Sequence, residues 1–111
     1  MVNPTHSSSP PVHIFQETIT GNFSASTYDI TQIVWSASPG AYFEGTFEIS
    51  NSSVSYGTVC GCITTTDCLE FITPIGFSVG RTVTKPTEFS ITVPAASSGT
   101  YSITLYKRVL A

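Results

Sequence analysis

Hydrophobic and polar residues alternate with a period of two along several segments of the chain. The alternation is clearest in three segments, residues 41–50, 88–93 and 100–110. In the first of them, Phe43 and Phe47 fall on one face and Tyr42 on the other. This period is typical of β-strands with one buried face. Five weaker runs, at residues 14–20, 27–35, 54–60, 62–73 and 77–84, bring the expected number of strands to about eight.

Turn-forming residues separate these runs, for example at Gly21-Asn22 and at Ser38-Pro39-Gly40. Glycine supplies a positive φ, proline a fixed φ, and asparagine and serine bond to their own backbone. Short strands at about ten-residue spacing predict an all-β, two-layer antiparallel sandwich of the jelly-roll type. An immunoglobulin-like connection is the alternative, and strand spacing does not choose between the two.

The composition agrees with this class. The chain has 111 residues, enough for one domain, and is 41% hydrophobic but only 10% charged. That combination is the opposite of the one that produces intrinsic disorder. The apolar residues are mostly β-branched or aromatic, and these fit a pleated sheet better than a helix. Helical bundles and α/β nucleotide-binding folds are therefore excluded.

The first residues have a different character from the rest. Residues 1–13 hold three of the seven prolines and show no hydrophobic period. We therefore expect a flexible N-terminal connector arm at residues 1–13 and a sandwich domain at residues 14–111. The residues expected to contact a neighbouring subunit through this arm are Pro10, Pro11, Val12, His13, Ile14 and Phe15. The opening has neither a basic start nor an apolar run, so we expect synthesis without a signal peptide.

Three cysteines lie close together, as Cys60-Gly61-Cys62 and Cys68. Residues one apart close a disulfide poorly, so the possible local bridge is Cys62–Cys68, which leaves Cys60 over. Reduced thiols in the core are the alternative. A metal site would need a fourth ligand from His6 or His13, and the spacing matches no zinc pattern, so we expect no metal and no cofactor.

Several classes of function lack the residues that they need. With four lysines and arginines and a net charge of −3, the chain cannot neutralise many phosphates, which argues against nucleic-acid binding. Its two histidines lie in the arm, and it contains no nucleophile elbow or phosphate loop, so we expect no catalytic residues and no enzymatic activity. Glu44 and Glu48 would stand about 13 Å apart on a strand, too far for a glycosidase pair.

The C-terminal part resembles a known family. The run Phe89-Ser-Ile-Thr-Val-Pro-Ala-Ala-Ser-Ser-Gly-Thr-Tyr-Ser-Ile-Thr-Leu-Tyr-Lys-Arg-Val109 is similar to the closing hairpin of the endospore-appendage pilins of bacilli. The resemblance implies a jelly-roll subunit that stacks by sheet augmentation and reaches into neighbouring subunits with an N-terminal connector. It also implies a protein made without a signal peptide. Cysteines that form covalent links in the family's connector are absent from residues 1–13, and Ser102 stands where its closing strand usually has a cysteine.

The resulting hypothesis is a structural subunit of a filament that lies outside the cell or on a spore surface. Its expected partners are other copies of itself, with a surface anchor protein as a further candidate, and neither nucleic acid nor membrane. One alternative is a viral or phage coat or decoration protein, since such proteins also combine a jelly roll with an arm. The other is a small carbohydrate-binding module with an aromatic platform, for which the candidate residues are Trp35, Tyr42, Phe43, Tyr56, Tyr101 and Tyr106.

Overall fold

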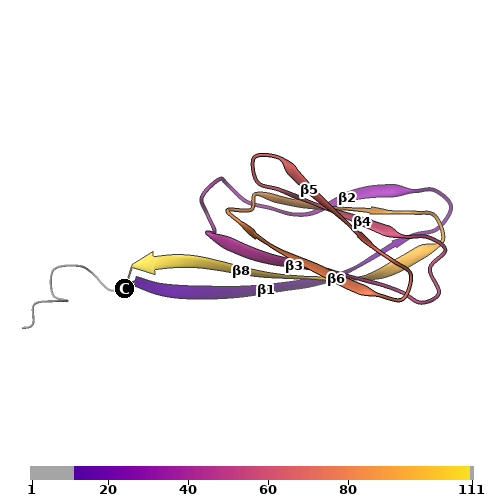
Figure 1. The fold of residues 1–111 in the computed structure, drawn as a ribbon, viewed down its shortest axis with the longest axis horizontal. Coiled ribbons are helices and arrows are strands. Elements are labelled where there is room, and N and C mark those ends of the chain that lie inside the picture. Colours follow the sequence, from indigo (N-terminus) through magenta and orange to yellow (C-terminus); the bar gives the residue numbers. More distant parts are fainter. Residues whose placement is uncertain (1–11, 111) are drawn as a thin grey trace, which may run out of the picture.

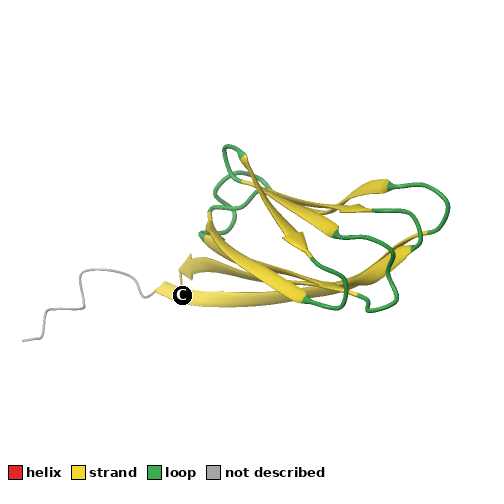
Figure 2. Ribbon diagram, turned by 45° about the vertical axis from the view of Figure 1, so that its right-hand side comes forward, coloured by secondary structure: helices red, strands yellow, loops and turns green. Residues whose placement is uncertain are grey.

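The computed structural model describes residues 12–110, and this part of the chain consists of strands joined by turns and loops (Figure 1; Figure 2). The strands are β1 Val12–Ala25, β2 Ile30–Ser36, β3 Glu44–Asn51, β4 Val59–Thr64, β5 Cys68–Thr73, β6 Ser78–Thr84, β7 Glu88–Val93 and β8 Ser97–Leu110. The predicted all-β class and the predicted number of strands are confirmed.

The strands form two antiparallel sheets of four, which pack face to face. Sheet A has the order β1-β8-β3-β6, and sheet B has the order β2-β7-β4-β5. Consecutive strands change sheet at every connection except one, the hairpin that joins β4 to β5 within sheet B. This order is that of a jelly roll, so the immunoglobulin-like alternative is wrong.

The core lies between the sheets and comes from the inward positions of the alternating strands. Its fully or almost fully buried residues are Phe23, Ala25, Phe47, Ile49, Val59, Ile63, Phe71, Phe89, Ile91, Val93, Ile103 and Leu105. At its centre the rings of Phe47 and Phe89 lie 5.0 Å apart. Gly61 leaves room for the Phe71 ring beside it and for Ile49 of the facing sheet, because a Cβ there would lie 2.7 Å from the ring and 2.8 Å from Cδ1 of Ile49.

Several predicted strand boundaries are wrong. The turn expected at Gly21-Asn22 lies inside β1, which continues to Ala25. Residues 54–58 were expected in a strand, but they form a loop before β4. The run expected over residues 62–73 is divided into β4 and β5 by a turn in which the Thr65 amide donates to the Asp67 carbonyl. An apolar run that crosses a short hairpin has the same period of two on both sides of the turn, so the pattern alone did not reveal the break.

The predicted faces are correct for Phe47 but wrong for Tyr42 and Phe43. Tyr42 packs against the core beside Trp35, with ring centroids 5.9 Å apart. Phe43 instead lies under the guanidinium of Arg108, whose central carbon is 4.0 Å from the ring centroid. Both residues precede β3, which begins at Glu44, so the alternation of the strand does not extend to them.

The molecule is elongated, and its two ends differ (Figure 1). At one end, β8 continues past Tyr106, the last residue at which it pairs with β3. Residues 107–110 there pair with residues 12–15 of β1 alone. We call these two segments the terminal ribbon. The opposite end consists of the loops at residues 26–29, 52–58, 74–77 and 94–96, which we call the distal loops.

Candidate assembly surfaces

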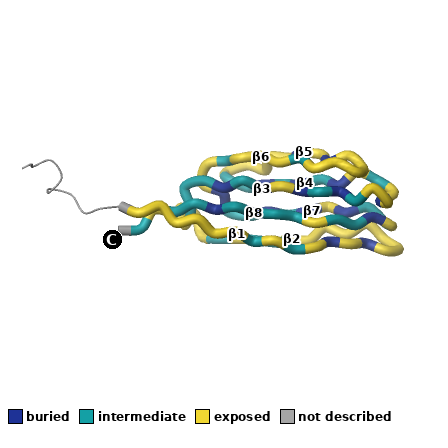
Figure 3. The backbone as a smooth tube through the Cα atoms, turned by 90° about the horizontal axis from the view of Figure 1, so that it is seen from below, coloured by how far each residue is buried: buried dark blue, intermediate teal, exposed yellow. Residues whose placement is uncertain are grey.

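Four strands border the sandwich and leave backbone groups open for pairing. Strands β5 and β6 border one side, and β1 and β2 border the other (Figure 3). Monomeric sheet proteins commonly protect such edges with charged side chains. Here β2 has no charged residue, β6 has only Arg81, and β5 has only Glu70. One protective feature is present on β2, where the register shifts between Ile33 and Trp35.

The two outermost strands of each sheet run in opposite directions. All pairs of neighbouring strands are antiparallel, and each sheet has four strands, so β1 opposes β6 and β2 opposes β5. A copy moved sideways without rotation would therefore bring its β1 antiparallel to β6, and its β2 antiparallel to β5. The direction of the strands permits both sheets to continue into such a neighbour.

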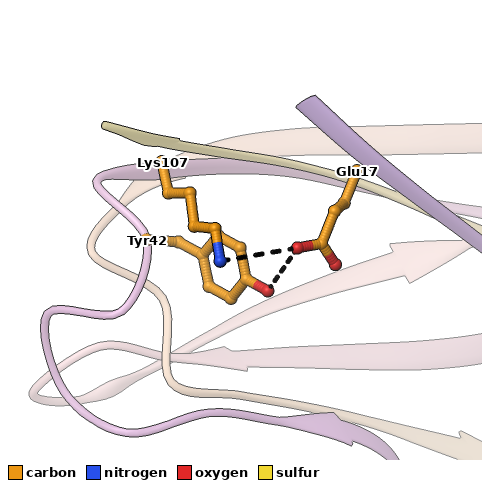
Figure 4. A network of polar contacts seen from close by, with 3 residues as sticks. All are labelled: Glu17, Tyr42 and Lys107. Atoms are coloured by element: carbon orange, nitrogen blue, oxygen red, sulfur yellow. Dashed lines mark hydrogen bonds and ion pairs between the residues drawn. The ribbon is translucent and has the colours of Figure 1, made fainter. Parts of the chain in front are cut away.

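A polar network joins the base of the terminal ribbon to the loop that precedes β3 (Figure 4). The Tyr42 hydroxyl donates to Oε1 of Glu17 at 2.9 Å, and Nζ of Lys107 lies 4.0 Å from the same oxygen. Lys107 also lies over the Tyr42 ring, with Nζ 5.6 Å from the centroid. Burial raises the pKa of the Tyr42 phenol, and the hydrogen bond to Glu17 and its negative charge raise it further. These contacts join β1 and β8 to the segment before β3.

The distal loops are held together mainly by a few side chains that bond to backbone groups. Nδ2 of buried Asn51 donates to the carbonyls of Gly57 and Thr73, at 3.0 and 3.1 Å. The hydroxyl of Ser97, also buried, accepts from the amides of Tyr56 and Gly57. These bonds link loop 52–58 to the start of β8 and to the end of β5.

Backbone bonds complete this arrangement. The Ala96 amide donates to the Ser26 carbonyl, and the Gly76 amide donates to the Asn51 carbonyl. All four distal loops are therefore connected to one another or to a shared strand end. Because these bonds tie each loop to another segment of the chain, we expect the loops to form a firm surface.

Large apolar side chains project from these loops. Tyr56 is 83% exposed, Tyr28 79% and Val54 76%, and Phe77 and Ile75 are also exposed. We call these five side chains the distal apolar surface. The only charged residue in the four loops is Asp29, and its carboxylate accepts from the Ala95 amide at 2.9 Å. Exposed apolar side chains that gather in one place are typical of an interaction site.

The cysteines lie on the outer face of sheet B. The sulfurs of Cys62 and Cys68 are bonded across the β4–β5 hairpin, with their Cα atoms 5.5 Å apart. Cys60 is a free, half-buried thiol, and its Sγ lies 4.0 Å from Oε2 of Glu70. Burial raises the pKa of this thiol, and the charge of Glu70 raises it further. A raised pKa lowers the fraction of reactive thiolate.

The residues predicted for the arm fall partly within β1. Val12 and His13 were assigned to the arm, but they pair with Leu110 and Val109, so the strand begins two residues earlier than expected. Ile14 and Phe15 follow in the same strand, and both are about half exposed. Pro10 and Pro11 lie outside the described residues.

The aromatic residues considered for sugar binding do not share a face. Trp35 and Tyr42 pack together against the core, and Tyr101 packs against it from β8. Phe43 pairs with Tyr106, with ring centroids 6.4 Å apart, and Tyr56 lies on the distal apolar surface. This dispersal removes the platform on which the carbohydrate-binding hypothesis depended.

Two kinds of feature are absent from residues 12–110. Within this part of the chain, histidine, cysteine, aspartate and glutamate do not gather in groups of three that could hold a metal ion. The same part contains no helix of the length and apolar character needed to cross a membrane.

No protein-family model and no curated protein sequence matches the chain. Solved structures do resemble it. A chain from the work "Bacillus endospore appendages form a novel family of disulfide-linked pili" superposes with a TM-score of 0.72 over 98% of both chains, at 16% identity. The structure of PirA covers 95% of this chain and 100% of its own, with 11% identity and a TM-score of 0.46. A cyanophage Pam1 capsid chain covers 100% of this chain and 93% of its own, with 14% identity and a TM-score of 0.38.

The first of these likenesses extends over nearly the whole sandwich and confirms the expected fold. At 16% identity it shows the fold and not the function. The PirA and capsid likenesses are too weak to support any function.

Proposed function

We propose that this protein is a structural subunit that joins copies of itself into a filament at the surface of a spore or cell. The observation that carries the proposal is the pair of sandwich sides whose edge strands are almost uncharged and run in opposite directions. The likeness to a chain of the Bacillus endospore appendages supports it through the shared fold. An anchor protein would be needed to attach the filament to a surface.

The expected lateral contact is the addition of one sheet edge to another. The β5/β6 side of one copy would meet the β1/β2 side of the next, with backbone hydrogen bonds across the junction. This contact joins two different surfaces, so each added copy leaves the same two surfaces free. Repetition then produces a polymer rather than a closed dimer. The arm, which precedes β1, would add a second contact.

The chemistry of the edges favours such pairing. Strand β6 is seven residues long, and five of them are exposed. Its side chains are small or β-branched except for Arg81, so it fits beside another strand. On β2, residues 30–33 precede the register shift and form the regular part of that edge. We expect this part to be the more favourable for pairing.

A charge placed on an edge strand tests the proposal. Lysine substitutions at Ser78 and Thr82, both exposed on β6, should abolish filaments or shorten them severely. Each lysine would be placed against the edge strand of the next copy without a partner of opposite charge. Thr92→Lys is the matched control, since Thr92 is exposed on the central strand β7. It should polymerise like the wild-type protein.

Electron microscopy and light scattering provide the measurement, and circular dichroism checks that each variant is folded. Filaments of the wild-type protein and of Thr92→Lys, together with monomers of the β6 variant, are the expected result. A wild-type protein that stays monomeric at every concentration, or a β6 variant that polymerises normally, would refute the edge contact.

A further inference from the structure

We propose that a cavity at the ribbon end of the sandwich binds a small organic carboxylate, and that Lys85 holds the carboxylate group. The cavity measures about 510 Å³ and is lined by four threonines together with Pro39, Gly40 and Lys85. These residues come from the loop before β3, the turn between β4 and β5, and the end of β6 with the turn that follows it. The inference goes beyond the proposed function, because a monomer would bind such a ligand as well as a filament would.

Lys85 has no partner for its charge within residues 12–110. The three other basic residues of the chain each lie over an aromatic ring, and Lys107 also forms an ion pair with Glu17. In the described part of the chain Lys85 has neither kind of contact. The lining contains no aspartate or glutamate, since Asp67 adjoins Thr66 but lies outside it. An ammonium group beside a cavity without acidic residues attracts anions into it.

The backbone of Lys85 is in a strained conformation. Its φ is 54°, in the left-handed region, and it directly precedes Pro86. A side chain makes the left-handed region unfavourable, and a following proline restricts a residue further. Glycine would adopt this φ without strain. Strained residues are concentrated at ligand-binding sites, so a lysine at this position points to a use for its side chain.

Hydrogen bonds hold the segments around the cavity together. The amide and the hydroxyl of Thr87 both donate to the Thr64 carbonyl, at 2.8 and 3.1 Å, and the Ala37 amide donates to the Thr87 carbonyl at 2.8 Å. The Lys85 amide donates to the Phe43 carbonyl at 3.0 Å. These bonds join the β6–β7 turn to both of the other segments. The cavity therefore exists before a ligand enters, and binding loses less conformational entropy.

The other lining residues indicate the class of ligand. Of the four threonines, only Thr87 has its hydroxyl bonded to another group of the described chain, so the other three can donate to an anionic oxygen. Threonine methyl groups and the Pro39 ring provide apolar surface, and the volume is that of a site for a small organic molecule. One lysine balances the single charge of a carboxylate, whereas a phosphate group carries about two negative charges. An organic carboxylate with a compact apolar body fits these features.

Benzoate is the probe for this site. Equilibrium dialysis against the full-length protein should show saturable binding of benzoate. Benzyl alcohol has the same ring without the charge, and inorganic phosphate has charge without the ring. Each should bind at least about tenfold more weakly than benzoate, because each lacks one of the two groups that the cavity recognises.

Photocrosslinking locates the bound carboxylate. The probe para-benzoylbenzoate carries the same carboxylate and reacts on irradiation with the groups around it. Mass spectrometry should find it attached within residues 37–43, 64–67 or 84–87, in monomers and filaments alike.

Substitutions at Lys85 test the role of its charge. Lys85→Met keeps a side chain of similar length, and it should weaken benzoate binding at least about tenfold. Lys107→Met is the matched control, because it removes the same charge at the same end of the molecule but outside the lining, and it should bind like the wild-type protein. Lys85→Gly should bind as weakly as Lys85→Met. Its midpoint of thermal unfolding should not fall, since glycine accepts the positive φ.

Several outcomes would overturn the inference. They are the absence of saturable binding, equal affinity for benzyl alcohol or phosphate, unchanged affinity of Lys85→Met, and crosslinks confined to the distal apolar surface. A lower unfolding midpoint of Lys85→Gly would also overturn it, because Lys85 would then serve the fold.

Electron microscopy of the full-length protein reports filament formation separately. Filaments without benzoate binding would remove this inference and leave the proposed function standing. Benzoate binding at Lys85 by a protein that never polymerises would support the inference and remove the proposed function.

Discussion

The two ends of the molecule satisfy the hydrogen-bonding groups of their backbone in different ways. At the terminal ribbon, the backbone groups between β1 and β8 satisfy one another, and side chains contribute only exposed contacts such as Glu17 with Lys107. At the distal loops, the chain turns between sheets, and buried side chains such as Asn51 and Ser97 satisfy the backbone instead. Stability at the distal end therefore depends on single residues, whereas stability at the ribbon is spread along a ladder of backbone hydrogen bonds.

The largest loss in the free energy of unfolding is expected from a substitution at Gly99, near the distal end of β8. A Cβ at this position would collide with the Ser50 carbonyl oxygen and with the Phe23 ring. Gly99→Ala should lower the free energy of unfolding by about 3 kcal/mol, because backbone must move to make room. Gly80→Ala is the control, since its Cβ would lie 3.5 Å from the nearest atom. Denaturant unfolding that shows equal effects for the two variants would contradict this account.

The second largest loss in the free energy of unfolding is expected at Asn51. Asn51→Ala removes both hydrogen bonds that tie loop 52–58 to β5, and leaves two carbonyls without this donor. We expect a loss of about 2 kcal/mol in the free energy of unfolding. Asn22→Ala, at an exposed position of β1, should change it by less than about 0.5 kcal/mol. Equal stability of the two variants in thermal or urea unfolding would show that the distal loops do not depend on this side chain.

A smaller effect is expected at the ribbon. Lys107→Met keeps most of the aliphatic stem but removes the charge that faces Glu17. Because both side chains are exposed, the free energy of unfolding should fall by less than about 1 kcal/mol, and the difference should shrink in high salt. A double-mutant cycle with Glu17→Gln measures the coupling. A coupling energy above about 2 kcal/mol would mean that the ribbon, like the distal end, depends on single side chains.

The smallest effect is a change in pH dependence. The pKa of Tyr42 is raised above its ordinary value of 10.0, so the folded protein holds the phenol proton more tightly than the unfolded chain does. The resulting stability is fully present below the ordinary pKa and is lost as the pH rises through the raised pKa. Tyr42→Phe should therefore show a flatter decline in unfolding free energy above pH 10 than the wild-type protein. Parallel declines would contradict a raised pKa of this phenol.

Much of the fold could be predicted because its signals are local. The alternation over residues 88–93 and 100–110 placed Phe89, Ile91 and Ile103 in the core, where all three are fully buried. The predictions failed where neighbouring residues lie outside a regular strand. Tyr42 and Phe43 exchanged their expected environments because the loop before β3 turns one ring towards Trp35 and the other towards Arg108.

The candidate surfaces were harder to predict. The pattern predicts a strand at Val54 and Tyr56, and nothing in it indicates that they project from a loop at the same end of the molecule as Tyr28 and Phe77. Their proximity depends on bonds between segments far apart in the chain, such as Tyr56 with Ala96 and Ala96 with Ser26. The local period of a single sequence does not record which distant segments become neighbours.

The sequence by itself determined the class of the protein, the number of its strands and most of the residues that they bury, because a period of two records which side of a strand faces water. Only the tertiary structure decided the jelly-roll order, the identity of the open edges and the composition of the distal apolar surface. Each of these depends on which strands become neighbours, as when Val12 pairs with Leu110 at the opposite end of the chain. Such pairing is selected by the packing of the whole core rather than by any one segment.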